Sequence, residues 1–128
     1  MLKQGILNPT LNRILSETGH TELLTLCDKG FPVPTGPERL DLALVDDIPK
    51  MMDVLKVVSE QFIIDRIFIA EEMKNVSQEY HDFLIKEFSD YQFEYVSHLY
   101  FKEIATESRA VIRTGETIPY SNMIIVSG

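Results

Sequence analysis

The sequence has a single cysteine, few basic residues and no long apolar run, and each of these absences excludes a class of protein. Lys and Arg number 12 against 20 Asp and Glu, which gives the 128 residues a formal net charge of -8. Non-specific binding to nucleic acid requires a basic surface, so we exclude that function. Cys27 stands alone and therefore cannot form an internal disulfide or a cysteine-rich zinc site.

The lack of long apolar runs also bears on location. The longest strongly apolar stretch, from Phe62 to Ala70, is interrupted by Asp65 and Arg66, and it is far shorter than the roughly 20 residues of a membrane helix. No basic start followed by an apolar run opens the chain, so we expect no secretory signal. A lone thiol suits a reducing compartment. We therefore expect a cytoplasmic protein that does not associate with membranes.

The composition is that of a folded domain. Hydrophobic residues make up 45% of the chain and charged residues 25%, which excludes disorder. The length fits a single domain over residues 1–128. Gly30, Gly36 and Gly115 form no phosphate-binding loop, so a nucleotide site is unsupported. A chain of this size has little room for a deep cavity of its own, and a small catalytic subunit often builds its cleft against a neighbour.

Short apolar strands alternate with amphipathic helices along the chain. The first helix is expected from Asn8, a good N-cap, to Gly19, a left-handed helix stop. Further helices are predicted at about 46–58, 77–88 and 99–106, and strands at 23–27, 39–44, 62–69, 93–98, 110–113 and 123–127. This order predicts an α/β fold, a three-layer α/β/α domain with a mostly parallel, mixed six-stranded sheet. The last two strands are close in sequence, which leaves open an antiparallel pairing between them.

Ligands of such folds bind beyond the carboxyl ends of the strands, and two polar side chains stand there. Asp28 follows the first strand, and His98 ends the strand over 93–98. His20 lies beside the beginning of the first strand, so it has to reach such a site by a different path. An imidazole, with a reference pKa of about 6.5, is suited to proton transfer near neutrality.

Each candidate also has an ordinary structural explanation. His20 would be an exposed residue at a helix C-terminus, and Asp28 an Asx-turn residue before Gly30. His98 would be a residue near the cap of the next helix. His20, Asp28 and His98 lack the short ligand spacing of a metal site, so we expect no metal. Cys27 ends an apolar strand and is expected to be inert.

A polar corner precedes the last strand. Pro119 stiffens a turn that continues with Tyr120, Ser121 and Asn122, a phenol, a hydroxyl and an amide. A polyhydroxylated ligand needs such donors and acceptors, because each buried hydroxyl must be paired. An ordinary polar turn explains the same residues equally well.

Several blocks of the sequence resemble the D-ribose pyranase family in order and register. They are residues 19–21, 27–34, 39–44, 69–74, 110–116 and 119–122, with Gly19-His20-Thr21 and Pro119-Tyr120-Ser121-Asn122 at the two ends. The resemblance runs nearly from end to end, and the stretch of about 77–94 is its least distinctive part.

The resemblance implies an isomerase without a cofactor, which interconverts the β-pyranose and β-furanose forms of free D-ribose before the sugar is phosphorylated. In this family the histidine matching His20 is the proton donor, and the positions matching Asp28, His98 and Tyr120-Ser121-Asn122 bind the sugar. Lys102 matches a family lysine near the site. The family forms homodecamers with sites at subunit contacts, so we expect a homo-oligomer.

Two other functions compete with this interpretation. A non-catalytic sugar-binding accessory of an uptake system would use the same polar groups without transferring a proton. A sugar-phosphate isomerase is disfavoured by the acidic balance and by the lack of an obvious anion-binding nest.

Overall fold

The two most apolar strands form the centre of a six-stranded sheet. In the computed structural model, which describes residues 1–128, β1 (Leu23–Cys27) pairs with β6 (Met123–Ser127). Both are almost wholly buried, as expected for strands that have helices on both faces. The other strands are β2 (Glu38–Asp41), β3 (Ile64–Ala70), β4 (Gln92–Val96) and β5 (Ala110–Arg113).

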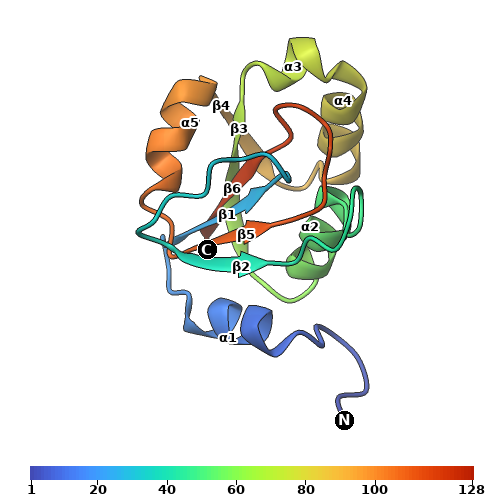
Figure 1. The fold of residues 1–128 in the computed structure, drawn as a ribbon, viewed down its shortest axis with the longest axis vertical. Coiled ribbons are helices and arrows are strands. Elements are labelled where there is room, and N and C mark those ends of the chain that lie inside the picture. Colours follow the sequence, from blue (N-terminus) through green and yellow to red (C-terminus); the bar gives the residue numbers. More distant parts are fainter.

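The strand order is β2-β5-β1-β6-β3-β4 (Figure 1). β6 is antiparallel to both of its neighbours, β1 and β3, while all other pairs are parallel. The mostly parallel, mixed sheet expected from the sequence is confirmed. The antiparallel pairing left open for the last two strands does not occur, because β5 and β6 flank β1 on opposite sides. The connection over residues 114–122 crosses the end of β1, where the Thr114 N–H donates to the Cys27 carbonyl at 2.8 Å.

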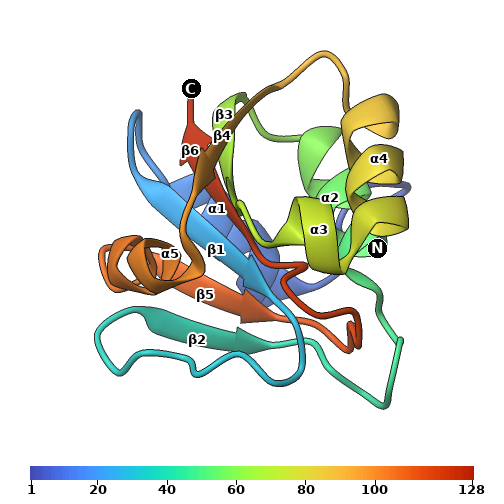
Figure 2. The same cartoon turned by 90° about the horizontal axis from the view of Figure 1, so that it is seen from above.

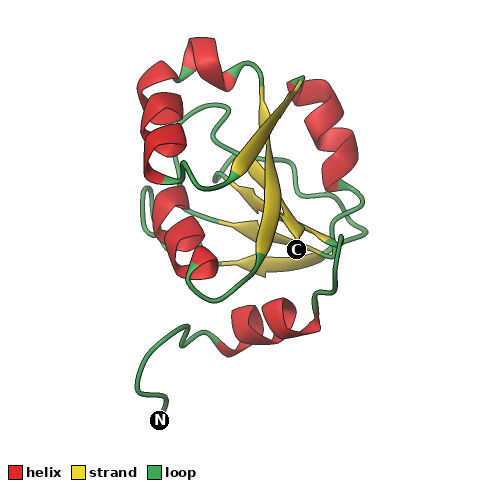
Figure 3. Ribbon diagram, turned by 180° about the vertical axis from the view of Figure 1, so that it is seen from behind, coloured by secondary structure: helices red, strands yellow, loops and turns green.

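Helices cover both faces of this sheet. They are α1 (Pro9–Glu17), α2 (Met51–Ser59), α3 (Met73–Val76), α4 (Gln78–Glu87) and α5 (His98–Ala105). Figure 2 shows α5 on one face and α2, α3 and α4 on the other. Seen from behind, α1 lies beneath the sheet, next to the N-terminal segment (Figure 3). The three-layer α/β/α architecture is therefore as expected. None of the helices combines the length and the apolarity that crossing a membrane requires.

The core follows the apolar periodicity of the helices. The apolar stripe of α2, formed by Met51, Val54, Leu55 and Val58, is buried in the larger core cluster with Leu24 and Leu26 of β1. A smaller cluster beneath α5 contains Phe101, Ala105 and Cys27. Full burial of a large apolar side chain contributes about 1.5–3 kcal/mol. These two clusters therefore fix α2 and α5 against opposite faces of the sheet.

The ends of two elements differ from the sequence expectation. α1 stops at Glu17, where the N–H of Thr18 bonds back to the carbonyls of Ile14 and Leu15. The left-handed residue after it is Thr21, with φ 68°, and not Gly19. The expected strand at 39–44 ends at Asp41 because the chain turns back on itself.

The turn at residues 45–48 explains that early end. The N–H of Leu44 donates to the carbonyl of Ile48 at 2.9 Å, so these residues are unavailable to extend β2 or α2. The same turn packs against Gly115, where an added Cβ would lie 2.4 Å from the Val45 carbonyl oxygen. Only glycine fits this close approach. The short helix α3 was not expected from the sequence at all.

Candidate active site

A polar cavity of about 370 Å³ opens at the carboxyl edge of the sheet. It is lined by Asp28, Gly30, Phe31, Pro32, His98, Lys102, Pro119, Tyr120 and Asn122. Strand direction brings these segments together. β1 ends immediately before Asp28, β4 ends two residues before His98, and β6 begins immediately after Asn122. Because β6 is antiparallel to β1 and β3, its beginning lies at the edge where they end.

Asp28 is held in a fixed orientation at the mouth of β1. Its Oδ1 accepts the N–H of Gly30 at 2.8 Å, which is the Asx turn offered as its structural explanation. Its own N–H donates to Oδ1 of Asn122 at 2.8 Å. Asn122 is buried, and this bond fixes its amide oxygen, so its NH2 group remains available to the cavity. The turn therefore builds the site, and Oδ2 of Asp28 is left for a ligand.

The corner at Tyr120 has an unusual backbone that is held from α4. Tyr120 has φ 55°, the left-handed region that costs a non-glycine residue roughly 1–2 kcal/mol. The carbonyl before it, of Pro119, accepts the Ser77 hydroxyl at 2.6 Å. The carbonyl after it, of Ser121, accepts the buried phenol of Tyr80 at 3.2 Å. Two hydrogen bonds thus fix the peptide groups on both sides of the corner.

Tyr120 lies near the end of the loop over residues 114–122, and a buried carboxylate fixes the beginning of this loop. Glu116 is only 2% exposed, and its carboxylate accepts the N–H of Met51 at 3.2 Å, at the start of α2. It also accepts the N–H groups of Thr117 at 3.1 Å and Ile118 at 3.4 Å. A negative charge is stabilised at a helix N-terminus. Glu116 therefore joins the loop to α2 without a basic partner.

His98 is the first residue of α5, and its surroundings disfavour the charged form. Its backbone N–H donates to both carboxylate oxygens of Glu72, at 3.0 and 3.1 Å. Burial lowers the pKa of His98, and the positive charge of Lys102, one turn further along α5, lowers it further. The carboxylates of Glu72 and Asp28 act in the opposite direction without reversing the shift. The imidazole is therefore mainly neutral at pH 7.

Two residues of the expected site do not line this cavity. Ser121 has no exposed surface, and its Oγ has no hydrogen-bond partner. Its backbone N–H donates to no carbonyl of the chain. His20 is exposed and lies before the beginning of β1, at the opposite edge of the sheet from Asp28. The strand between them has five residues, and at a rise of about 3.3 Å per residue it separates the two by roughly 16 Å.

Sequence reasoning missed several residues that support the site. Ser77, Tyr80 and Glu116 act through hydrogen bonds between segments far apart in sequence, and no local pattern indicates such contacts. Glu72 follows the end of β3, so the strand-end rule that selected Asp28 applies to it as well. No group of three or more His, Cys, Asp or Glu side chains is arranged to hold a metal ion.

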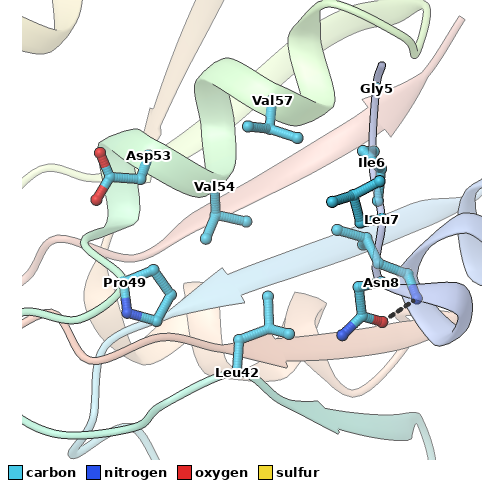
Figure 4. Close-up of a pocket in the computed structure, with 10 residues that line it drawn as sticks. Gly5, Ile6, Leu7, Asn8, Leu42, Pro49, Asp53, Val54 and Val57 are labelled. Carbon is cyan, nitrogen blue, oxygen red and sulfur yellow. Dashed lines mark hydrogen bonds between the residues drawn. The ribbon is translucent and has the colours of Figure 1, made fainter. Parts of the chain in front are cut away.

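A second cavity of similar volume has a different character. It lies between the N-terminal segment and α2, and Figure 4 shows Ile6, Leu7, Leu42, Val54 and Val57 around it. Its one charged side chain, Asp53, already accepts the Lys50 N–H at 3.0 Å. This apolar lining does not suit a polyhydroxylated ligand, whereas the cavity at the carboxyl edge of the sheet does.

Comparison with known proteins gives the family. The sequence profile of the RbsD / FucU transport protein family matches residues 1–128, and the chain belongs to this family. A D-ribose pyranase from Kosmotoga olearia is 44% identical over 129 residues, covering 100% of this chain and 98% of the relative. A D-ribose pyranase from Bacillus subtilis is 41% identical over 128 residues, again covering 100% and 98%.

Solved structures agree with the fold. The structure of Bacillus subtilis RbsD complexed with D-ribose matches with a TM-score of 0.95 at 41% identity, covering 100% of this chain and 98% of that one. The fucose mutarotase of Streptococcus pneumoniae, in complex with L-fucose, matches with a TM-score of 0.79 at 23% identity, covering 99% and 98%. The second likeness establishes the fold alone.

Proposed function

We propose that this chain is an isomerase that interconverts the β-pyranose and β-furanose forms of D-ribose. The observation that carries the proposal is the full-length structural match to a ribose-bound relative at 41% identity. The cavity at the carboxyl edge of the sheet supports it, because a carboxylate, an imidazole, a phenol and an amide converge there on a space suited to a small polyol.

The chemistry requires proton transfer and little else. The anomeric hydroxyl loses a proton while the ring oxygen gains one, and the bond between C1 and the ring oxygen breaks. The open-chain aldehyde then closes through a different hydroxyl. Acid–base catalysis contributes typically 10²–10⁴-fold, which is sufficient for a reaction that already proceeds in water. One imidazole that is partly protonated near neutrality can act as the acid in one direction and as the base in the other.

His20 is the proposed proton carrier, and Asp28, His98, Tyr120 and Asn122 are the proposed sugar-binding side chains. Ser121 is proposed to contribute through its backbone N–H, which donates to no carbonyl of the chain, since its side chain is fully buried and does not line the cavity. Lys102 lines the same cavity and is proposed as a further donor to the sugar. No cofactor or metal is part of the proposal.

The distance between His20 and the cavity makes the proposal depend on assembly. Each chain carries the cavity at one edge of its sheet and His20 at the other, so His20 has to come from a neighbouring copy. A head-to-tail contact of this kind closes into a ring when the rotation between copies permits. The proposed homodecamer, implied by the family resemblance, and the proposed cytoplasmic location are consistent with such a subunit.

A second candidate is a sugar-binding protein without catalytic activity. The observation that favours it is the absence of His20 from the cavity of the single chain. Such a protein would bind ribose through the same side chains but would add nothing to the spontaneous rate of ring exchange.

Magnetisation-transfer NMR on ribose separates the two candidates. We expect the wild-type protein to accelerate exchange between pyranose and furanose, and His20→Ala to lower the rate by about 10²-fold or more. His81→Ala is the matched control, because His81 lies on α4 and bonds to Tyr95 outside the cavity. Wild-type protein that binds ribose without accelerating exchange would establish the non-catalytic alternative.

Mixed assemblies test whether His20 acts across the subunit contact. His20→Ala and Asp28→Asn are each expected to be inactive. Dissociating and reassembling the two variants together should restore part of the wild-type rate, since some contacts then join an intact His20 to an intact cavity. Mixtures that stay as inactive as the separate variants would contradict sharing of the site between copies.

A further inference from the structure

The ring of His98 is clamped by aromatic neighbours in one orientation. It stacks on Phe101 with centroids 6.2 Å apart and an interplanar angle of 17°. Tyr120 meets it edge-on at 5.0 Å and 90°, and Phe31 does so at 6.4 Å and 78°. These contacts come from α5, from the corner before β6 and from the loop after β1. The orientation of the two ring nitrogens is therefore fixed before any ligand arrives.

The two nitrogens of that ring have different surroundings. Nδ1 is buried and has no hydrogen-bond partner. The Glu72 carboxylate makes no hydrogen bond to Nδ1 and instead accepts the backbone N–H of His98 with both of its oxygens. His98 nevertheless lines the cavity, so Nε2 is the nitrogen that can reach a ligand. An unpaired buried polar atom is rare enough in proteins to require an explanation.

We propose that His98 is a neutral hydrogen-bond donor whose proton stays on Nε2. It neither gives a proton to the sugar nor takes one from it during the reaction. This inference rests on the proposed function and gives His98 a distinct role within it. With the proton on Nε2, the buried Nδ1 exposes only a lone pair to its apolar surroundings. Proton uptake would create an N–H on Nδ1 with no acceptor, which is the costlier defect.

The charged groups around the ring support the neutral form. Lys102 on the same helix and the N-terminus of α5 both oppose a positive charge. Asp28 and Glu72 favour it, and the phenol ring of Tyr120 meets the imidazole edge-on. Burial is the largest influence and lowers the pKa of His98. A neutral imidazole at a helix N-terminus is a known form of electrophilic hydrogen-bond donor.

The two histidines of the proposed mechanism then have different roles, sugar binding for His98 and proton transfer for His20. His98 holds one sugar oxygen with a hydrogen bond whose strength does not change with pH near neutrality. His20 alone gains and loses a proton. The pH dependence of the rate should consequently report one histidine and not two.

The first test observes the ring directly and does not depend on activity. The chain has three histidines, so two-bond proton–nitrogen correlation spectra of protein labelled with ¹⁵N-histidine can be assigned by replacing each in turn. We expect the His98 signals of the Nε2–H tautomer at neutral pH, with protonation of the ring only below the reference pKa of about 6.5. A signal of the Nδ1–H tautomer, or titration near the reference pKa of about 6.5, would overturn the inference.

The second test compares side chains that imitate one nitrogen each. Gln places an amide N–H close to the position of Nε2, whereas Asn places it close to Nδ1. We expect His98→Gln to exchange ribose more slowly than wild type but at least about tenfold faster than His98→Asn or His98→Ala, with the wild-type pH profile. His81→Gln is the control and should keep both rate and profile.

A proton carrier would behave differently in this series. His98→Gln would then be as slow as His98→Ala, by the 10²–10⁴-fold typical of acid–base groups, and one limb of the pH profile would disappear. The two tests also separate the failure of this inference from the failure of the proposed function. Wild-type protein without exchange activity refutes the function, while the nitrogen signals still decide the state of His98.

Discussion

At the scale of single residues, burial decides which ionisable groups can react. Cys27 ends β1 with no exposed surface, and burial raises the pKa of its thiol to about 12, with the neighbouring charge of Asp28 as the next cause. The thiolate is the reactive form of cysteine. The sequence predicted that Cys27 ends a buried apolar strand, and the structure confirms this burial.

This environment predicts that Cys27 resists thiol reagents in the folded protein. We expect iodoacetamide at neutral pH to leave the native chain unmodified and to alkylate it once urea has unfolded it. Mass spectrometry before and after unfolding measures the difference. Rapid alkylation of the native protein would show that the strand end opens to solvent.

The sequence allowed prediction of those site residues that directly follow a strand, because the direction of the strands places them at one edge of the sheet. Asp28 and His98 were selected because each stands at a strand end, and the structure brings both to the cavity. Ser77 and Tyr80 were beyond reach, because each acts by a hydrogen bond to a carbonyl 41 or 42 positions away. Such a contact depends on how α4 packs, which the sequence of α4 alone does not determine.

At the scale of elements, α4 supports the corner that carries Tyr120. Tyr80→Phe removes only the hydroxyl that bonds to the Ser121 carbonyl. We expect a loss of about 1 kcal/mol in the free energy of unfolding, the usual net value of one hydrogen bond. The corner should loosen as well, which weakens sugar binding in the ground and transition states alike.

The measurement for this variant is the division of the effect between KM and kcat. We expect KM for ribose exchange to rise by up to about tenfold, with a smaller change in kcat. Tyr91→Phe is the matched control, since Tyr91 stacks on Phe88 in the turn before β4. A purely structural role for Tyr80 would lower the stability and leave KM at the wild-type value.

Elements were predictable where one face or both faces of the chain are apolar. β1, β5 and β6 have the bounds that the sequence indicated, because each is a short apolar run that is buried in the sheet. The strand expected over 39–44 was too long because Leu42 and Leu44 imitate strand alternation. Leu44 is 77% exposed, and its alternation reflects no sheet contact.

At the scale of the whole molecule, the two halves of the proposed site lie at opposite edges of one sheet. Activity should therefore depend on contact between copies. We expect the rate per chain to fall on dilution, toward that of His20→Ala, as native mass spectrometry shows the assembly dissociating. A rate per chain that stays constant through dissociation would mean that a single subunit is sufficient.

The position of β6 has a consequence for the order in which the molecule is made. The sheet consists of two parallel blocks, β2-β5-β1 and β3-β4, and only β6 joins them. β6 follows the other five strands in the chain, so the two blocks can unite only once residues 123–127 have been synthesised and have left the ribosome. Asp28 follows the first block and His98 follows the second, so the cavity that both residues line cannot form before β6 is in place. A chain that lacks β6 would expose two unpaired strand edges that invite aggregation.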